Sequence, residues 1–260
     1  MLNNSNDNSY EIAKSFSNSE IQVFKQNEIQ GSYATRAYGV KKSSGNYFLF
    51  IDADVIFSSN ALDSIFKLIL KNEVKYAGFN VKMKLCSNSL SSKMNFIKGF
   101  NVKRCIEKDR YTPTCALLVE KKVYINCGGF DESLESSGDY IFGLTVSQLK
   151  INQLYIENIE FYHPTRITYQ SLISKSNRIA RGHVQLYFKD KENYGNLYAG
   201  HFKLKNFIPK NPFTYKKIFK IYGFDFGLKE FLFTPFFYIP ISFIRLFHAY
   251  NYFKKINQND

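Results

Sequence analysis

Residues 47–54 have the sequence Tyr-Phe-Leu-Phe-Ile-Asp-Ala-Asp, an apolar run that ends in two carboxylates. Five consecutive apolar residues predict a buried strand. Ligands of open α/β sheets bind beyond the carboxyl ends of strands, so Asp52 and Asp54 are expected where a polar ligand would lie. We therefore expect this stretch to decide both the fold and the position of the site.

The two carboxylates favour a cation site. Asp52 and Asp54 fall on the same side of an extended segment, and two close carboxylates repel by about 1 to 4 kcal/mol, depending on screening. A hard divalent cation such as Mg²⁺ or Mn²⁺ removes this repulsion and takes its other ligands from water and phosphate oxygens. A solvated turn is the alternative, because Asp-x-Asp occurs in many unrelated proteins. The metal interpretation predicts a diphosphate ligand.

The chain has 260 residues, which is enough for one sizeable α/β domain with a small appendage. Hydrophobic residues make up 45% of it and aromatic residues 17%, which indicates a folded protein. Its first nine residues are polar and do not resemble a signal peptide, so a cytoplasmic location is expected. Four cysteines without Cys-x-x-Cys spacing do not predict a zinc site.

The formal net charge of +13 is concentrated near the C-terminus, where residues 201–260 contain ten Lys or Arg against three acids. No nucleic-acid-binding motif accompanies this charge, so no nucleic acid partner is expected. Residues 231–244 of the same region are largely apolar but interrupted by Pro235 and Pro240, and are too short to span a bilayer comfortably. Such a segment suits the surface of an anionic membrane; a helix packed on the domain is the alternative.

Hydrophobic periodicity predicts alternating strands and helices. The predicted strands are 21–24, 47–51, 79–85, 115–119, 154–157 and 159–162, and the predicted helices are 10–16, 60–70, 94–105, 139–150 and 169–189. The helix at 60–70 is expected to bury an apolar face that includes Leu62, Ile65 and Phe66. This alternation predicts the α/β class.

Further short motifs occur in a characteristic order: Asn4-Ser-Asn-Asp-Asn-Ser-Tyr-Glu-Ile-Ala-Lys14, Ala34-Thr-Arg-Ala-Tyr-Gly39, Asp52-Ala-Asp54, Gly128-Gly-Phe-Asp-Glu132, Gly138-Asp139 and His163-Pro164. In this order they resemble family 2 glycosyltransferases with the GT-A fold, a mixed sheet flanked by helices. The resemblance covers roughly residues 3–185. It implies an enzyme of the hexosyltransferase class that binds a nucleotide-diphosphate sugar, uses Mg²⁺ or Mn²⁺, and inverts the anomeric centre.

The resemblance also assigns roles to single residues. Asp54 would ligate the metal, Asp52 would lie near the ribose or the metal shell, and Arg36 would lie near the nucleotide. Asp139 would be the general base that takes a proton from the acceptor hydroxyl; a helix N-cap is the alternative role of this residue. His163 would be a further metal ligand, although a single His before Pro also occurs for structural reasons.

Several glycines and arginines complete the expected site. Gly128, Gly129 and Gly138 would approach the donor sugar or the acceptor, and many family members carry Glu where this chain has Gly138. A plain turn is the alternative for the Gly128-Gly129 pair. Arg178 and Arg181 could clamp the leaving diphosphate, but we favour a solvated helix face for them.

The resemblance places the opening strand and first helix of the family before Met1, so we expect a core that is incomplete at the N-terminus. We divide the chain into an incomplete GT-A-like domain, residues 1–190, and a basic, aromatic-rich helical segment, residues 191–260. The expected function is sugar transfer to a cell-surface polysaccharide or a lipid-linked glycan at the cytoplasmic face of the membrane. The alternative is a noncatalytic remnant or accessory binding protein that keeps the GT-A core.

Overall fold

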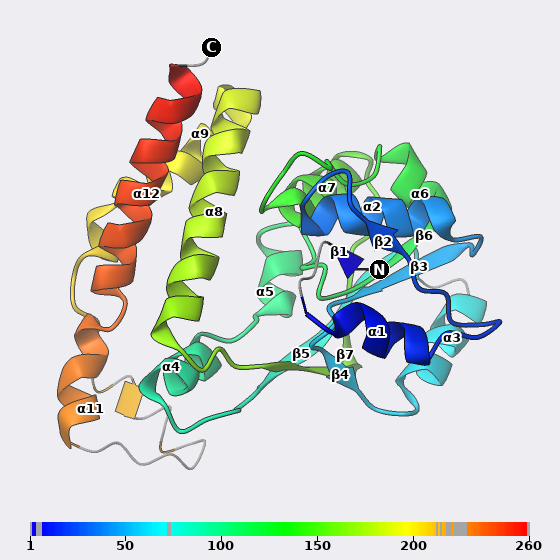
Figure 1. Cartoon of the computed structure of the whole chain (residues 1–260), viewed down its shortest axis with the longest axis horizontal. Helices are drawn as coiled ribbons and strands as arrows, with labels where there is room; N and C mark the ends of the chain where they lie inside the picture. Colours follow the sequence, from blue (N-terminus) through cyan, green and yellow to red (C-terminus); the bar gives the residue numbers. More distant parts are fainter. Residues whose placement is uncertain are drawn as a thin grey trace. The chain divides into compact units, whose positions relative to one another are not determined.

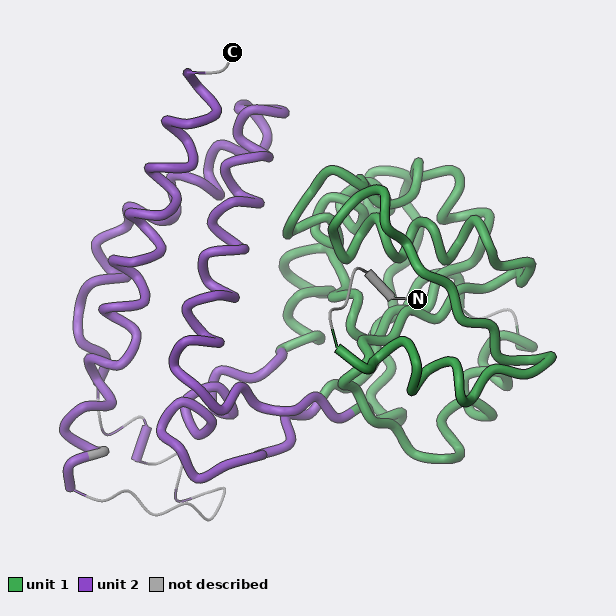
Figure 2. Tube along the Cα trace, in the orientation of Figure 1, with its two compact units in different colours: residues 1–81, 101–161 green, residues 82–100, 162–260 purple. Residues whose placement is uncertain are grey.

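The computed structural model describes residues 2–3, 7–71, 74–211, 213, 215–216, 220 and 228–258. The chain forms two compact units that interleave in sequence (Figure 2): unit 1 contains residues 1–81 and 101–161, and unit 2 contains residues 82–100 and 162–260. The domain boundary predicted at residue 190 stays a prediction. Part of the predicted motif at 4–14, residues 4–6, lies outside the described residues.

Unit 1 is built on a five-stranded sheet with the order β3-β6-β5-β7-β4. Its strands are β3 (Tyr47–Ile51), β6 (Ala116–Glu120), β5 (Tyr76–Lys84), β7 (Leu154–Pro164) and β4 (Ile56–Phe57). Strand β6 is antiparallel to both β3 and β5, and Ile51 lies opposite Ala116. The end of β3 and the beginning of β6 therefore lie side by side at one edge of the sheet.

Helices flank this sheet (Figure 1). Unit 1 contains α1 (Ser9–Ser15), α2 (Ser32–Lys42), α3 (Ala61–Leu70), α5 (Val102–Glu107), α6 (Lys121–Asn126) and α7 (Gly138–Gln148). A small two-stranded parallel sheet joins β1 (Leu2–Asn3) to β2 (Lys25–Gln26). The α/β architecture agrees with the sequence prediction, and the sheet is mixed as expected.

An aromatic core lies between the sheet and the helices that carry the site. The Phe130 ring lies 5.1 Å from the Phe50 ring of β3 and 4.9 Å from the Phe142 ring of α7. Tyr124 of α6 contacts Phe130 as well, with 5.4 Å between ring centroids. Offset and edge-on pairs of this kind add about 0.5 to 1.5 kcal/mol each beyond their buried area. The core therefore fixes α7 and the Phe130 loop against β3.

Unit 2 is mainly helical. Its elements are α4 (Leu90–Lys98), α8 (Tyr169–Lys189), α9 (Lys191–Ala199), η1 (Gly200–Phe202), η2 (Leu204–Asn206), α11 (Leu228–Phe233), η3 (Thr234–Phe236) and α12 (Ile239–Asn257). Helices α8 and α12 lie side by side (Figure 1). One apolar cluster between them includes Leu172 and Ile241, and a second includes Ala180, Val184 and Ala249. Helix α8 has the bounds that the sequence predicts.

Four sequence predictions for local structure were wrong. Residues 21–24 form no strand, because the pairing moves to Lys25–Gln26. Helix 94–105 is divided into α4 and α5 at Gly99, whose φ of +54° ends the first helix. Strands 154–157 and 159–162 are one continuous strand, β7. Of the predicted apolar face of α3, Ile65 is buried, whereas Leu62 and Phe66 are exposed.

Candidate active site at the end of strand β3

The two carboxylates of the Asp-x-Asp sequence lie in the turn that follows β3. The Asp52 backbone N–H donates to the carbonyl oxygen of Cys115 at 3.3 Å, which extends the pairing with β6 by one residue. The Val55 N–H then donates to the Asp52 carbonyl oxygen at 3.0 Å and closes the turn. Asp52 is partly buried and Asp54 is exposed. The backbone thus holds both side chains at the sheet edge that the sequence predicted.

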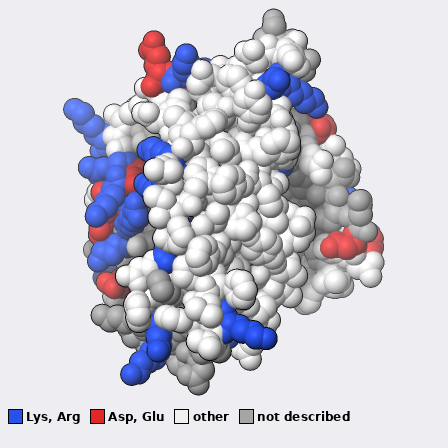
Figure 3. All heavy atoms as spheres, turned by 90° about the vertical axis from the view of Figure 1, so that its left-hand side faces the viewer, with Lys and Arg blue, Asp and Glu red and all other residues white. Residues whose placement is uncertain are grey.

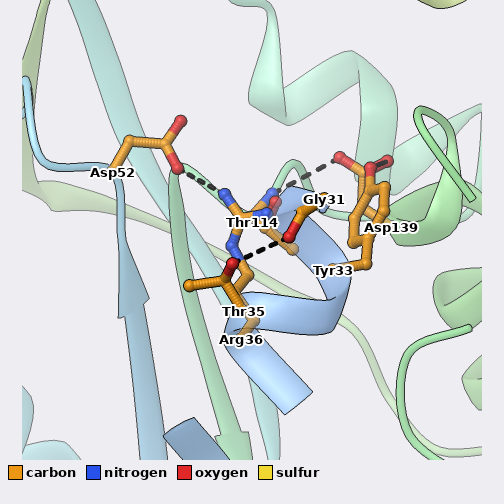
Figure 4. A network of polar contacts seen from close by, with 7 residues as sticks. All are labelled: Gly31, Tyr33, Thr35, Arg36, Asp52, Thr114 and Asp139. Atoms are coloured by element: carbon orange, nitrogen blue, oxygen red, sulfur yellow. Dashed lines mark hydrogen bonds and ion pairs between the residues drawn. The ribbon is translucent and has the colours of Figure 1, made fainter. Parts of the chain in front are cut away.

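Arg36 reaches the same edge from α2. Its Nη2 donates to Oδ1 of Asp52 (Figure 4), and its guanidinium carbon lies 5.6 Å from the centre of the Tyr33 ring. Planar guanidinium groups pair well with carboxylates and with phosphates, so Arg36 can contact both a neighbouring acid and a phosphorylated ligand. The predicted neighbours Arg36 and Asp52 are therefore in direct contact.

Asp139 lies in the first turn of α7, where three donors surround its carboxylate. The Tyr33 hydroxyl donates to Oδ1 at 2.9 Å, and the Tyr140 N–H donates to the same oxygen at 3.0 Å. The Thr114 N–H donates to Oδ2 at 3.4 Å. Figure 4 shows Tyr33 of α2 and Thr114, which precedes β6, converging on Asp139. Because both elements meet at the β3 edge, the carboxylate of Asp139 is held near Arg36 and Asp52.

The environment of Asp139 raises its pKa above the ordinary value of an aspartic acid. Burial of the carboxyl group is the largest cause, because it disfavours the charged form. The Tyr33 hydrogen bond and the positive charge of Arg36 act in the opposite direction and limit the rise. A carboxylate with a raised pKa binds a proton more strongly than a solvated one. Asp139 is therefore suited to accept a proton from a hydroxyl group.

Tyr33 is the residue of this site that the sequence analysis missed. Its side chain is buried, and its ring contacts that of Phe130 with 5.7 Å between centroids. The hydrogen-bonded partner, Asp139, is 106 residues away in the sequence. One local signal was present: Tyr33 lies three residues before Arg36 on α2, and residues at this spacing share a helix face.

Gly138 is explained by the same tyrosine. A Cβ atom at position 138 would lie 2.9 Å from atoms of the Tyr33 ring, which is closer than real Cβ contacts. The absence of a side chain therefore lets Tyr33 approach α7 and reach Asp139. This gives a structural reason for Gly at position 138. Its predicted contact with sugar or acceptor stays a prediction.

Gly128 and Gly129 form the turn that ends α6. Both have left-handed backbone conformations, with φ values of +76° and +71°. The Gly129 N–H donates to the Tyr124 carbonyl oxygen at 2.9 Å, and a Cβ atom on Gly129 would lie 2.9 Å from the Tyr124 ring. Glycine is favoured here by conformation and by close packing. The turn carries Phe130 into the core, and a role in sugar binding stays a prediction.

The other predicted residues belong to unit 2. His163 lies in β7, is buried, and places Nδ1 at 2.8 Å from the Pro164 carbonyl oxygen, with its ring 4.9 Å from that of Phe100. Its role as a metal ligand stays a prediction. Arg178 is exposed, as favoured, but Arg181 is partly buried and its Nη1 lies 2.9 Å from Nε2 of His248. The solvated helix face predicted for both arginines is thus wrong for Arg181.

Solved structures share this fold. The mannosyltransferase PcManGT from Pyrobaculum calidifontis, in complex with GDP-Man and Mn²⁺, superposes with a TM-score of 0.52 at 13% identity, over 89% of this chain and 69% of its own. Residues 1–349 of S. aureus TarS, in complex with UDP-GlcNAc, give a TM-score of 0.50 at 13% identity, over 98% and 81% of the two chains. These similarities confirm the predicted GT-A fold.

Sequence comparisons identify the family. Glycosyltransferase AglE from Haloferax volcanii is 26% identical over 214 residues, which are 81% of this chain and 70% of that protein. The sequence model described as Glycosyl transferase family 2 matches residues 1–131, just over half of the chain. The expectation of a glycosyltransferase is confirmed at this level. This chain belongs to glycosyl transferase family 2.

Proposed function

We propose that this glycosyltransferase moves a sugar from a nucleotide-diphosphate sugar to a hydroxyl acceptor and inverts the anomeric centre. One observation carries the proposal: Arg36, Asp52, Tyr33 and Asp139 form a polar group at a single edge of the unit 1 sheet. The Arg36 guanidinium and the Asp52 carboxylate, which suit a phosphorylated donor, thus lie close to the Asp139 carboxylate, which suits proton acceptance. A site for single displacement needs both functions.

In this reaction Asp139 accepts the proton of the acceptor hydroxyl while that oxygen attacks the anomeric carbon of the donor. The bond between the anomeric carbon and the diphosphate oxygen breaks, and its electron pair leaves with the diphosphate. Attack opposite the leaving group inverts the configuration. A positioned general base contributes typically about 10²- to 10⁴-fold to the rate. Tyr33 and the backbone N–H groups hold the carboxylate in place between turnovers.

The residues present fit a hard divalent cation. Asp54 is an exposed carboxylate at the strand end, and Asp52, two residues earlier, contacts Arg36, so we assign the cation to Asp54. His163 is retained as a further ligand on the sequence alone; with the Nδ1 proton donated to the Pro164 carbonyl, its Nε2 carries the lone pair. When bound, Mg²⁺ or Mn²⁺ would stabilise the negative charge of the leaving diphosphate. The Pyrobaculum structure, which contains Mn²⁺ and GDP-Man, supports this choice.

For the acceptor we propose a cell-surface polysaccharide or a lipid-linked glycan, used at the cytoplasmic face of the membrane, and we place the enzyme in the hexosyltransferase class. The basic and aromatic composition of residues 201–260 supports the membrane location. We leave the nucleotide base of the donor to experiment, because the solved structures of similar fold contain GDP-Man in one case and UDP-GlcNAc in another.

The test is thermal unfolding of the full chain with Mn²⁺ and, in turn, UDP, GDP, dTDP and CDP. A ligand at about 100 times its dissociation constant stabilises the protein by about 2.7 kcal/mol, which raises Tm by several degrees. We expect a metal-dependent rise with one nucleotide and its loss in Asp54→Asn. The absence of any rise in a chain that unfolds cooperatively would contradict the proposal.

The noncatalytic alternative makes a different prediction for the same protein. A binding protein that keeps only the GT-A core would show the nucleotide-dependent rise in Tm but would neither hydrolyse nor transfer the matching donor sugar. We expect slow release of the free nucleotide from the matching sugar nucleotide even without acceptor. A nucleotide-dependent rise in Tm without any turnover, even when extracts that contain acceptor glycans are added, would favour the alternative.

A further inference from the structure

Helix α12 presents large apolar side chains on two opposite faces. One face packs against α8 and includes Ile241 and Ala249, which are buried. The other includes Phe243 and Phe247, which are 57% and 68% exposed, and Tyr250, which is also exposed. These three residues recur at intervals of four and three, so they form one stripe along the helix. A helix at the surface of a soluble domain normally carries polar residues on this stripe.

The exposed stripe continues onto neighbouring elements of unit 2. The loop after η2 contacts α12, because the Phe207 ring lies 4.7 Å from that of Phe243. It also contacts η3, because the Lys210 N–H donates to the Pro235 carbonyl oxygen at 3.0 Å. Nine large apolar side chains of these elements are exposed, and we name them the apolar face of unit 2: Leu204, Ile208, Leu232, Phe233, Phe236, Phe243, Ile244, Phe247 and Tyr250. Figure 3 shows a wide field without charged side chains on the side that carries α11 and α12. Contiguous exposed apolar patches of this kind mark interaction sites.

The charges around this face select the partner. Neither α8 nor α12 contains Asp or Glu, and residues 231–259 contain no acid at all. Exposed Lys203, Lys205 and Lys210 lie in or next to the η2 loop, and exposed Lys254 and Lys255 lie in the last turn of α12. Figure 3 shows Lys and Arg side chains around the uncharged field, with some Asp and Glu side chains beside them. An apolar centre with a cationic margin complements an anionic lipid surface, where each basic residue contributes about 1 kcal/mol.

The contacts of α12 decide how it meets a bilayer. Residues 231–257 are long and apolar enough to cross a membrane. Only 22% of the most apolar 18-residue window is buried inside the protein, so most of this window is exposed. The opposite face of α12 carries Arg245 and His248, and His248 Nε2 lies 2.9 Å from Arg181 Nη1 of α8. Crossing the bilayer would separate α12 from α8 and place Arg245 in hydrocarbon, at a cost of about 2.5 kcal/mol or more. An orientation in the membrane plane keeps these contacts.

We propose that the apolar face of unit 2 binds the surface of an anionic lipid bilayer, with α12 lying in the membrane plane. Phe243 and Phe247 enter the boundary between headgroups and acyl chains, and the lysines at the margin contact lipid phosphates. This inference deepens the proposed function, since it supplies the surface for the membrane location proposed there. It does not depend on donor binding, which belongs to unit 1 and is measured separately.

The test is flotation of the full chain with vesicles of phosphatidylcholine, with or without phosphatidylglycerol. We expect binding to the vesicles that contain phosphatidylglycerol, weakened by high salt, and a loss of about tenfold or more in Phe243→Ser/Phe247→Ser. The matched control is Leu62→Ser/Phe66→Ser on α3, where Phe66 is 60% exposed. It should float like the unchanged chain. Thermal unfolding of each variant with the matching nucleotide shows whether unit 1 stays folded and binds donor.

Four outcomes would overturn the inference. Equal flotation of Phe243→Ser/Phe247→Ser and the unchanged chain would remove the role of this face, and equal loss in the α3 control would make the binding nonspecific. Resistance to extraction from vesicles by alkaline carbonate would indicate a spanning helix rather than one in the plane. Conversion of a dimer to a monomer by the α12 variant, without lipid binding in either form, would assign the face to a second copy of the chain. Loss of nucleotide binding with normal flotation would count against the proposed function alone.

Discussion

The edge of the unit 1 sheet and the outer face of α12 use their side chains in opposite ways. At the sheet edge, polar groups face inward and partner each other, as Tyr33 partners Asp139 and Arg36 partners Asp52, above a tightly packed aromatic core. On α12, apolar rings face outward and basic residues surround them without an acid in the helix. The first arrangement is preorganised for a small charged ligand, and the second is suited to an extended surface. We therefore propose that the sheet edge carries the reaction and that the outer face of α12 binds the membrane.

The largest effect is expected where the polar arrangement carries the reaction. Asp139→Asn removes the proposed proton acceptor but can still receive the Tyr33 hydrogen bond, so we expect transfer to fall by about 10²- to 10⁴-fold while the nucleotide-dependent rise in Tm persists. The matched control is Asp63→Asn, an acid in the first turn of α3, which should leave transfer unchanged. Activity of Asp139→Asn within a few-fold of the original would remove Asp139 as the base.

This region is also where sequence reasoning went furthest. The run at 47–51 predicted strand β3, and the acids after it lie at the sheet edge, because strand direction alone determines that position. Asp139 begins a helix as expected. Tyr33 could not be predicted in the same way, since its contact with Asp139 depends on the packing of α2 against α7 and on the missing side chain at Gly138. Local patterns predict elements, but long-range packing decides which side chains meet.

The C-terminal helix shows a different limit. The sequence left two alternatives for the segment 231–244, membrane contact or packing on the domain. In the structure one face of α12 packs on α8 and the other is exposed, so the packing alternative holds for one face only. Periodicity could not separate the faces, because apolar residues lie on both. The partial burial of Arg181 was likewise hidden, since it depends on a contact with His248, which is distant in sequence. The break at Gly99 had a local signal, because a glycine with a φ of +54° can end a helix.

A second prediction tests how tightly the site is packed. Gly138→Ala places a Cβ atom 2.9 Å from the ring of the buried Tyr33, which has little room to move. Overpacking of this kind costs about 1 to 3 kcal/mol, so we expect Tm to fall by several degrees and activity to fall with the displaced tyrosine. Gly195→Ala in α9 is the control, because its Cβ atom would have 3.6 Å to the nearest atom and should be neutral or stabilising. Equal tolerance of both substitutions would show that the site is not closely packed.

A third prediction separates the hydroxyl of Tyr33 from its ring. Tyr33→Phe keeps the packing against Phe130 but removes the donor to Asp139, so the pKa of Asp139 should rise further. We expect kcat to fall by up to about tenfold, and the acid limb of the pH-rate profile to move to higher pH. Tyr124→Phe is the control, since the Tyr124 hydroxyl accepts from the Phe130 N–H and does not contact Asp139. It should lower stability without moving the acid limb. An unshifted limb in Tyr33→Phe would confine Tyr33 to packing.

Acid should change the free energy of unfolding in opposite directions through groups in the two units. In unit 2, His183 Nδ1 lies 3.1 Å from His201 Nε2, and burial together with the charge of Arg245 lowers the pKa of His183 to about 4. Burial and the neighbouring His183 lower the pKa of His201 to about 3. Below about pH 6.5 the unfolded chain therefore binds protons that the folded pair does not, and stability falls as the pH falls toward these values. Asp139 acts in the opposite direction, because its raised pKa lets the folded state bind its proton first.

We expect Tm to fall by a few degrees between neutral pH and about pH 5, within the range set by the two histidines. In His201→Gln the curve of Tm against pH should lie lower throughout, because a buried hydrogen bond is lost, but its slope should be flatter. In Asp139→Asn the slope should be steeper, because the compensating proton uptake is gone. The slope is the informative quantity, since a change in packing alone shifts the curve without tilting it. Parallel curves for the unchanged chain and the two variants would show that neither the histidine pair nor Asp139 changes its protonation on folding. The difference between the sheet edge and α12 would then rest on geometry alone.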